Sequence, residues 1–192
     1  MSDSLSPGFA DTVGDAQSCF RLVLDAMARP GHVLAVRGVS APAPLCDAAA
    51  AVVLTLLDHE TPLWLDSHAA AARAWIAFHT GAPLIEDPAG AMFALALCFP
   101  VTAAGLPLGT DEAPETSATL ILQVASLTSG TGFVLEGPGL REPATLTVDG
   151  LPPDFAAIWQ RNHALFPRGI DLILCAGTRL AALPRSVTVR EA

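Results

Sequence analysis

The sequence predicts one α/β domain of three layers, in which helices cover both faces of a mixed β-sheet. Stretches with helical and with strand periodicity follow one another along 192 residues, without an internal repeat. Residues 120–125 are apolar on both faces, which is typical of a central strand with helices on each side. No segment has the composition of a linker, so we expect residues 1–192 to form a single domain.

Four helices are expected from the spacing of apolar residues. Asp15 is predicted to cap the first, which runs to residue 28 and stops at Pro30-Gly31. The other three are expected at residues 45–57, at residues 69–79 and after the prolines at 152 and 153. The first helix is predicted to bury Phe20, Val23, Leu24 and Met27, and the last to bury Phe155, Ile158, Trp159 and Leu165.

Strands are predicted where short apolar or alternating runs are bounded by turn residues. Residues 133–136 and 144–148 alternate, and Gly137-Pro138-Gly139 lies between them, which indicates a hairpin at a sheet edge. Residues 103–117 form the longest expected loop. The other strands are expected at residues 32–36, 63–65, 83–85, 92–97, 120–125 and 170–174, with a last edge strand at 187–189.

The composition excludes several classes of function. A net charge of −9 and an isoelectric point near 4.8 argue against binding of nucleic acid or of an anionic membrane. All ten basic residues are arginines. Without lysine the chain can form neither a Schiff base with pyridoxal phosphate nor a lysine-containing phosphate loop, so no cofactor is expected. The segment after residue 140 is nearly neutral and is the part best suited to meet an anionic substrate.

No membrane anchor is expected in this sequence. Residues 1–8 lack the basic start and the apolar run of a signal peptide. The longest charge-free stretch, residues 91–110, is interrupted by Pro100, Gly105 and Pro107 and cannot form one continuous spanning helix. These features predict a soluble, cytoplasmic protein.

The cysteines and histidines do not follow the spacing of a metal site. No C-x-x-C pair is present, so we expect buried, reduced thiols rather than metal ligands or a redox pair. His59-Glu60 resembles the start of a zinc motif, but Leu63 stands where the second histidine would be required. The four cysteines are Cys19, Cys46, Cys98 and Cys175.

Arg168 and Asp171 are the first candidates for a ligand site or an interface. They lie in the segment 166–171, at the mouth of a predicted central strand, and ligands of α/β sheets usually bind at strand ends. A guanidinium there could clamp a phosphate. The alternative is a surface ion pair between the two residues around a tight turn.

Three further candidates are weighed against simpler structural roles. Arg185 follows Pro184 and either lines a cleft or is a solvated or interface charge. His163, on the last predicted helix, is either a base or a satisfied structural group. Asp111 belongs to an acidic loop, residues 109–115, which could support acid–base chemistry or simply form a charged surface.

Separated segments of the chain together resemble one known family. They are Asp15-Ala-Gln17, Phe20-Arg21 and residues 26–31, 118–127 and 166–185, and they resemble the PhnH family of the bacterial carbon–phosphorus lyase system. The resemblance implies a sheet similar to that of the large domain of pyridoxal-phosphate-dependent transferases, without the cofactor site. It also implies a homodimer in isolation.

The resemblance implies a role in the breakdown of organophosphonates. PhnH proteins act with G, I and L partners to make α-D-ribose 1-alkylphosphonate 5-triphosphate from ATP and an alkylphosphonate, releasing adenine, and G, H, I and J subunits form a core complex. The implied role is that of an accessory or scaffold subunit, not active alone. Two alternatives stay open: a stand-alone enzyme that binds a phosphorylated ligand with Arg168 and Arg185, and a degenerate transferase relative that only dimerises.

Overall fold

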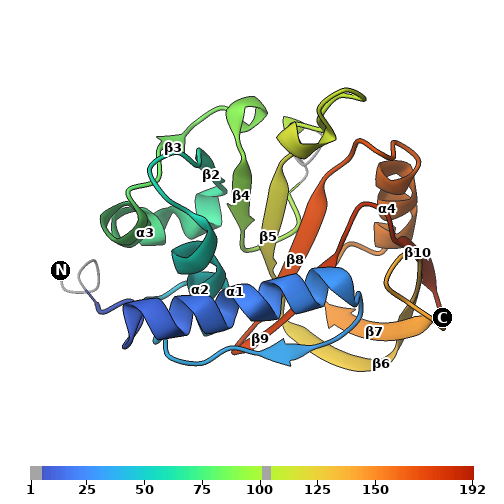
Figure 1. The fold of residues 1–192 in the computed structure, drawn as a ribbon, viewed down its shortest axis with the longest axis horizontal. Coiled ribbons are helices and arrows are strands. Elements are labelled where there is room, and N and C mark those ends of the chain that lie inside the picture. The colour runs from blue at the N-terminus through green and yellow to red at the C-terminus, as the bar shows by residue number, and fades with distance from the viewer. Residues whose placement is uncertain (1–5, 101–104) are drawn as a thin grey trace.

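A seven-stranded mixed sheet forms the centre of the protein, in a computed structural model that describes residues 6–100 and 105–192 (Figure 1). The strand order is β1-β9-β8-β5-β4-β2-β3, with β3, β2, β4, β5 and β8 parallel and β9 antiparallel to both of its neighbours. These strands are β1 (Leu34–Ala35), β2 (Leu63–Leu65), β3 (Leu84–Ile85), β4 (Phe93–Ala96), β5 (Thr119–Gln123), β8 (Asp171–Ala176) and β9 (Arg179–Leu183).

Different layers cover the two faces of this sheet. Helices α1 (Thr12–Ala28), α2 (Asp47–Leu56) and α3 (Arg73–Thr80) pack on one face. Helix α4 (Phe155–His163) and a small antiparallel sheet pack on the other. Neighbouring residues of β5 and β8 point to opposite cores: Ile121 and Ile173 face α1–α3, whereas Leu120 and Leu172 face α4. The predicted mixed α/β fold is therefore confirmed, with the second face covered by one helix and a small sheet.

Helix α1 begins one turn earlier than the sequence suggested. Its N-cap is Asp11, whose Oδ1 accepts hydrogen bonds from the backbone N–H groups of Val13 and Gly14. Asp15, the predicted cap, lies inside the first turn, where its Oδ2 accepts from the backbone N–H of Asp11. Both carboxylates accept hydrogen bonds from backbone N–H groups at the start of this helix, which is why either could be mistaken for the cap.

The buried face of α1 also differs from the prediction. Val23 is buried, with Cys19 and Ala26 beside it, whereas Phe20 and Leu24 are 46% and 53% exposed. The neighbouring helix α2 is buried on all sides, because α1 lies against it on one side and β5 and β8 lie against it on the other. Small side chains dominate the buried face of α1, and Leu22 and Met27 pack partly buried against the same core.

The predicted hairpin belongs to a separate sheet. β6 (Ser126–Glu136) and β7 (Ala144–Asp149) pair antiparallel, and β10 (Thr188–Glu191) adds to β6, giving the order β10-β6-β7. The predicted hairpin is therefore confirmed, and its second strand lies at a sheet edge as expected, but the sheet is a separate one of three strands and not the large sheet. β9 was not predicted at all, although the predicted strands at 63–65, 92–97, 120–125 and 170–174 are confirmed within two residues.

The third helix is confirmed with a break in its geometry. Residues Ser67–Ala72 form a 3₁₀ helix (η2), and α3 continues from it to Gly81, which ends the helix with a φ of 69°. A short 3₁₀ turn (η5, Pro114–Thr116) also lies in the segment predicted as the longest loop, of which residues 103 and 104 fall outside the described part. No helix in the described ranges is both long and apolar enough to cross a bilayer.

Candidate functional site

Asp171 and Arg185, two of the predicted site residues, form a partly buried ion pair with each other. The Arg185 Nε and Nη2 atoms lie 3.2 and 2.5 Å from the two oxygens of Asp171, and the backbone N–H of Arg185 donates to Asp171 Oδ1 at 2.8 Å. Arg185 Nη1 donates to the carbonyl of Pro114 at 2.7 Å. The two side chains are 14% and 22% exposed. Through these contacts Arg185, which lies between β9 and β10, links the start of β8 to η5.

The other three predicted residues lie around this pair. The Arg168 Nε atom lies 3.2 Å from Asp111 Oδ1, an ion pair in which the N–H direction does not complete a hydrogen bond. His163 Nδ1 lies 3.0 Å from the backbone carbonyl of Arg185. The carbonyl of Pro167 lies 3.5 Å from Arg185 Nη1. All five residues predicted from the sequence therefore gather in one region.

This region lies at the amino-terminal edge of the parallel strands. Asp171 is the first residue of β8, and the neighbouring strand β5 begins at Thr119 in register with it. Ligands of α/β sheets bind outside the carboxyl ends of the strands. The guanidiniums of Arg168 and Arg185 both pair with carboxylates, so these contacts connect neighbouring loops of the structure. A role of these residues in binding or catalysis stays a prediction.

A pocket of about 560 Å³ lies beneath α4, on the same face of the sheet as the small sheet. Trp159 and Leu165 line it from the α4 side, and Leu120 and Leu172 line it from the sheet. Its charged lining residues are Asp154 and Arg161. A mostly apolar pocket with one arginine is unsuited to a triphosphate, which requires several cations or backbone donors.

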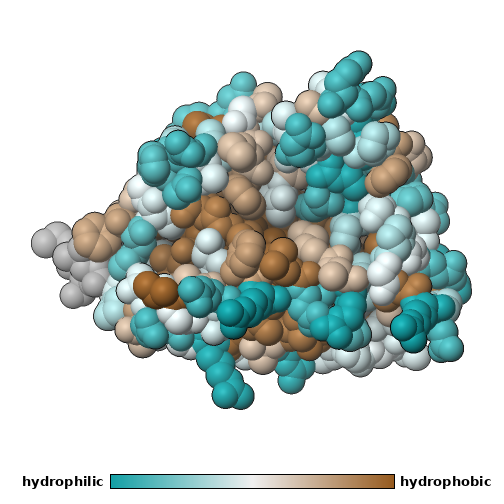
Figure 2. Space-filling model, in the orientation of Figure 1, coloured by the Kyte–Doolittle hydropathy of each residue, from teal (hydrophilic) through white to brown (hydrophobic). Residues whose placement is uncertain are grey.

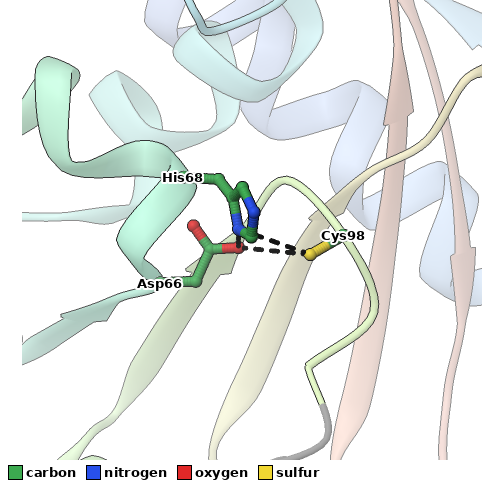
Figure 3. A group of neighbouring side chains, drawn as sticks. All are labelled: Asp66, His68 and Cys98. Carbon is green, nitrogen blue, oxygen red and sulfur yellow. Dashed lines mark hydrogen bonds and ion pairs between the residues drawn. The ribbon is translucent and has the colours of Figure 1, made fainter.

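Asp66, His68 and Cys98 form a second cluster of polar side chains, which the sequence analysis missed (Figure 3). Asp66 and His68 follow β2, and Cys98 follows the adjacent parallel strand β4. The Asp66 Oδ2, His68 Nδ1 and Cys98 Sγ atoms lie 3.5 to 3.9 Å from one another. The cluster therefore occupies the carboxyl edge of the sheet, the edge at which ligands of this fold class bind.

The sequence contained a signal for this cluster that spacing rules do not test. Asp66 and His68 are two residues apart, and Cys98 lies about thirty residues further on, so no metal or catalytic motif matches them. The signal was positional, because polar residues follow two predicted strands at the same end. Cys98 also corrects the expectation that the cysteines are buried, since it is exposed.

We predict that Cys98 reacts with thiol reagents well before the other three cysteines. Burial raises the pKa of Cys19 and of Cys46, and raises the pKa of Cys175 well above its usual value, so these three hold less of the reactive thiolate at neutral pH. Peptide mass spectrometry during alkylation by iodoacetamide measures the four rates. In denaturant the four rates should converge. Modification of Cys175 in the native protein as fast as that of Cys98 would contradict the prediction.

The sequence matches the family of bacterial phosphonate metabolism proteins named PhnH over residues 7–190. It is 41% identical over 200 aligned residues to the α-D-ribose 1-methylphosphonate 5-triphosphate synthase subunit PhnH of Rhizobium meliloti (strain 1021), with 100% of this chain and 98% of that protein covered. It is 30% identical over 177 residues to a putative C-P lyase subunit protein, HtxG, of Stutzerimonas stutzeri, with 90% of this chain and 85% of that protein covered. The chain belongs to the PhnH family of bacterial phosphonate metabolism proteins.

Proposed function

We propose that this chain is the PhnH-type subunit of an α-D-ribose 1-methylphosphonate 5-triphosphate synthase, within a carbon–phosphorus lyase system. The observation that carries the proposal is the 41% identity to the Rhizobium subunit, which extends over the whole chain. In this role the chain acts in the cytoplasm with G, I and L partners, and with J in a core complex. Its own part is that of an accessory or scaffold subunit.

The distribution of charge supports a role that depends on partners. Five of the ten arginines pair with carboxylates, and each of three pockets of the described residues holds a single arginine. A chain of net charge −9 without converging cations binds ATP or a phosphonate poorly by itself. Partner surfaces would supply the positive charge that a triphosphate requires. The pairing of Arg168 and Arg185 also leaves a stand-alone enzyme built on these two residues without support.

The outer face of α1 supports a role in assembly. Val13, Phe20 and Leu24 are exposed and lie seven and four residues apart, which places them in one stripe along the helix. Figure 2 shows that hydrophobic side chains also gather near the middle of this face of the molecule, just above α1. We propose that a second copy of the chain covers the α1 stripe in the isolated protein, giving a homodimer.

Co-purification tests the subunit proposal directly. The tagged chain is expressed with the G, I, J and L proteins of the same bacterium, and native mass spectrometry weighs what elutes. We expect a stoichiometric assembly with the partners and a dimer when the chain is expressed alone. Adenine release from ATP and methylphosphonate should require the chain together with G, I and L, and should be absent with the chain alone.

Two outcomes would contradict the proposal. One is a lone dimer that associates with none of the partners, which is the behaviour expected of a relative that only dimerises. The other is full adenine release by the partners when this chain is omitted. As a control, an Arg141→Ala variant should assemble and act as the wild-type chain does, because Arg141 is exposed and lies in a bend outside both clusters.

A further inference from the structure

The geometry points to a site for one zinc-like divalent cation at Asp66, His68 and Cys98, and we propose that the chain binds a transition metal there. Figure 3 shows the three side chains pointing toward one another from the segments after β2 and β4. The Nδ1–Oδ2, Nδ1–Sγ and Oδ2–Sγ distances are 3.6, 3.5 and 3.9 Å. An ion seated just above the plane of these three atoms would lie about 2.1–2.3 Å from each, and zinc binds oxygen and nitrogen at about 2.0–2.2 Å and sulfur at about 2.3 Å.

The separations between the ligand atoms fit a tetrahedral ion as well. Oxygen, nitrogen and sulfur ligands of a tetrahedral zinc ion lie about 3.4 to 3.6 Å apart, given those bond lengths. The largest difference is on the Asp66–Cys98 edge, at 3.9 Å. Small rotations of the exposed His68 and Cys98 side chains would close it. The cluster is thus close to a metal-binding geometry before any ion arrives.

Backbone groups hold the Asp66 carboxylate in place. Its Oδ1 accepts from the N–H of Ala69 at 2.8 Å, and its Oδ2 accepts from the N–H of Leu97 at 2.9 Å. Asp66 is buried, and its own N–H donates to the carbonyl of Leu95 at 3.0 Å, which continues the β2–β4 pairing. Carboxylates that bind metals are usually oriented by such hydrogen bonds. The same Oδ2 atom lies 3.6 Å from His68 Nδ1 and 3.9 Å from Cys98 Sγ.

A Cys–His–Asp catalytic triad does not fit these contacts. A triad requires the carboxylate at one ring nitrogen of the histidine and the nucleophile at the other. Here the Asp66 carboxylate and the Cys98 thiol both approach Nδ1 of His68. Three ligand atoms of different types that converge on one point are the arrangement that a cation requires. Proton relay through an imidazole requires its two partners at opposite ring nitrogens.

The donor set also selects the class of metal. A thiolate and an imidazole favour zinc or cobalt over magnesium and calcium, which prefer oxygen ligands alone. Three protein ligands leave a fourth position for water or another oxygen ligand, as in catalytic rather than structural zinc sites. His68 and Cys98 are exposed, so this fourth position would open to solvent.

Metal titration of the purified chain tests the proposal. The chain is stripped with a chelator and titrated with Co²⁺, and Zn²⁺ is then added in competition. We expect one cobalt ion per chain, with a thiolate-to-cobalt charge-transfer absorption that Zn²⁺ abolishes. Bound Zn²⁺ should also slow alkylation of Cys98, while the rates for the other cysteines stay unchanged.

Three variants locate the site, and one serves as a control. Cys98→Ser and His68→Ala should each weaken Zn²⁺ binding by at least about 100-fold, since each removes a ligand. Asp66→Asn should weaken it by about 10- to 100-fold while leaving an acceptor for the Ala69 N–H. His59→Ala, a change at another exposed histidine, should leave the affinity unchanged.

Two results would overturn the proposal. The first is the absence of a charge-transfer band and of zinc protection of Cys98 in the wild-type chain. The second is equal zinc affinity in wild type, Cys98→Ser and His68→Ala, each shown to be folded by circular dichroism. Both readouts use the isolated chain and the metal alone, so neither depends on its role in phosphonate metabolism.

Discussion

Replacement of Arg185 by alanine is expected to lower the free energy of unfolding by about 3 kcal/mol. The change removes the two side-chain hydrogen bonds to the Asp171 carboxylate, which is 22% exposed, and leaves the one from the backbone N–H of residue 185. Breaking a buried pair from one side costs about 3–5 kcal/mol, and the partial exposure of this pair places it at the lower end. The substitution also removes the hydrogen bond from Nη1 to the carbonyl of Pro114. Urea unfolding at neutral pH measures the loss.

Two further variants show whether geometry or charge is responsible. Arg185→Lys keeps the charge but not the planar fork, so we expect an intermediate loss of about 1–2 kcal/mol. Arg190→Ala breaks an ion pair with Glu136 in which both side chains are at least half exposed, and it should cost less than about 1 kcal/mol. If Arg185→Ala were no more destabilising than Arg190→Ala, the Arg185–Asp171 pair would not be holding these loops together. Arg185 would then be free for the phosphate-binding role that the sequence suggested.

The local features of the fold were predictable because they depend on neighbouring residues. The apolar run of β5 marks it as a central strand, and Gly81 ends α3 where a left-handed residue is required. The same alternating pattern, however, is compatible with either of two sheets. Nothing in residues 133–136 and 144–148 shows that they form a separate sheet with β10 rather than extending the large sheet.

The candidate sites show the same limit more sharply. Arg168 and Asp171 were correctly placed at the end of a central strand, but the strand's direction assigns them to its amino end. Asp66 and Cys98 meet because β2 and β4 are adjacent and parallel, which the order and the direction of the strands determine together. The spacing of residues along the sequence reflects only short-range geometry. A site assembled from two strands about thirty residues apart depends on how the strands are arranged in the sheet.

Trp159→Ala is expected to be strongly destabilising, lowering the free energy of unfolding by about 4 kcal/mol. Trp159 is 2% exposed, its ring stacks on Phe155 with centroids 5.9 Å apart, and its Nε1–H donates to the carbonyl of Val187 at 2.9 Å. Deleting a buried aromatic side chain costs about 3–5 kcal/mol through lost burial and the cavity left behind. A loss of this size should lower Tm by roughly 10 °C in a chain of this length.

Matched substitutions separate the contributions of the ring and of its N–H group. Trp159→Phe keeps most of the buried area but leaves the Val187 carbonyl without its indole donor, so we expect a loss of about 1–2 kcal/mol. Phe78→Ala removes an exposed aromatic side chain from α3 and should change stability by less than about 0.5 kcal/mol. Circular dichroism in urea measures all three variants without depending on tryptophan fluorescence. Because α4 packs against β10, a small effect of Trp159→Ala would mean that this helix is not what holds the small sheet over the second face.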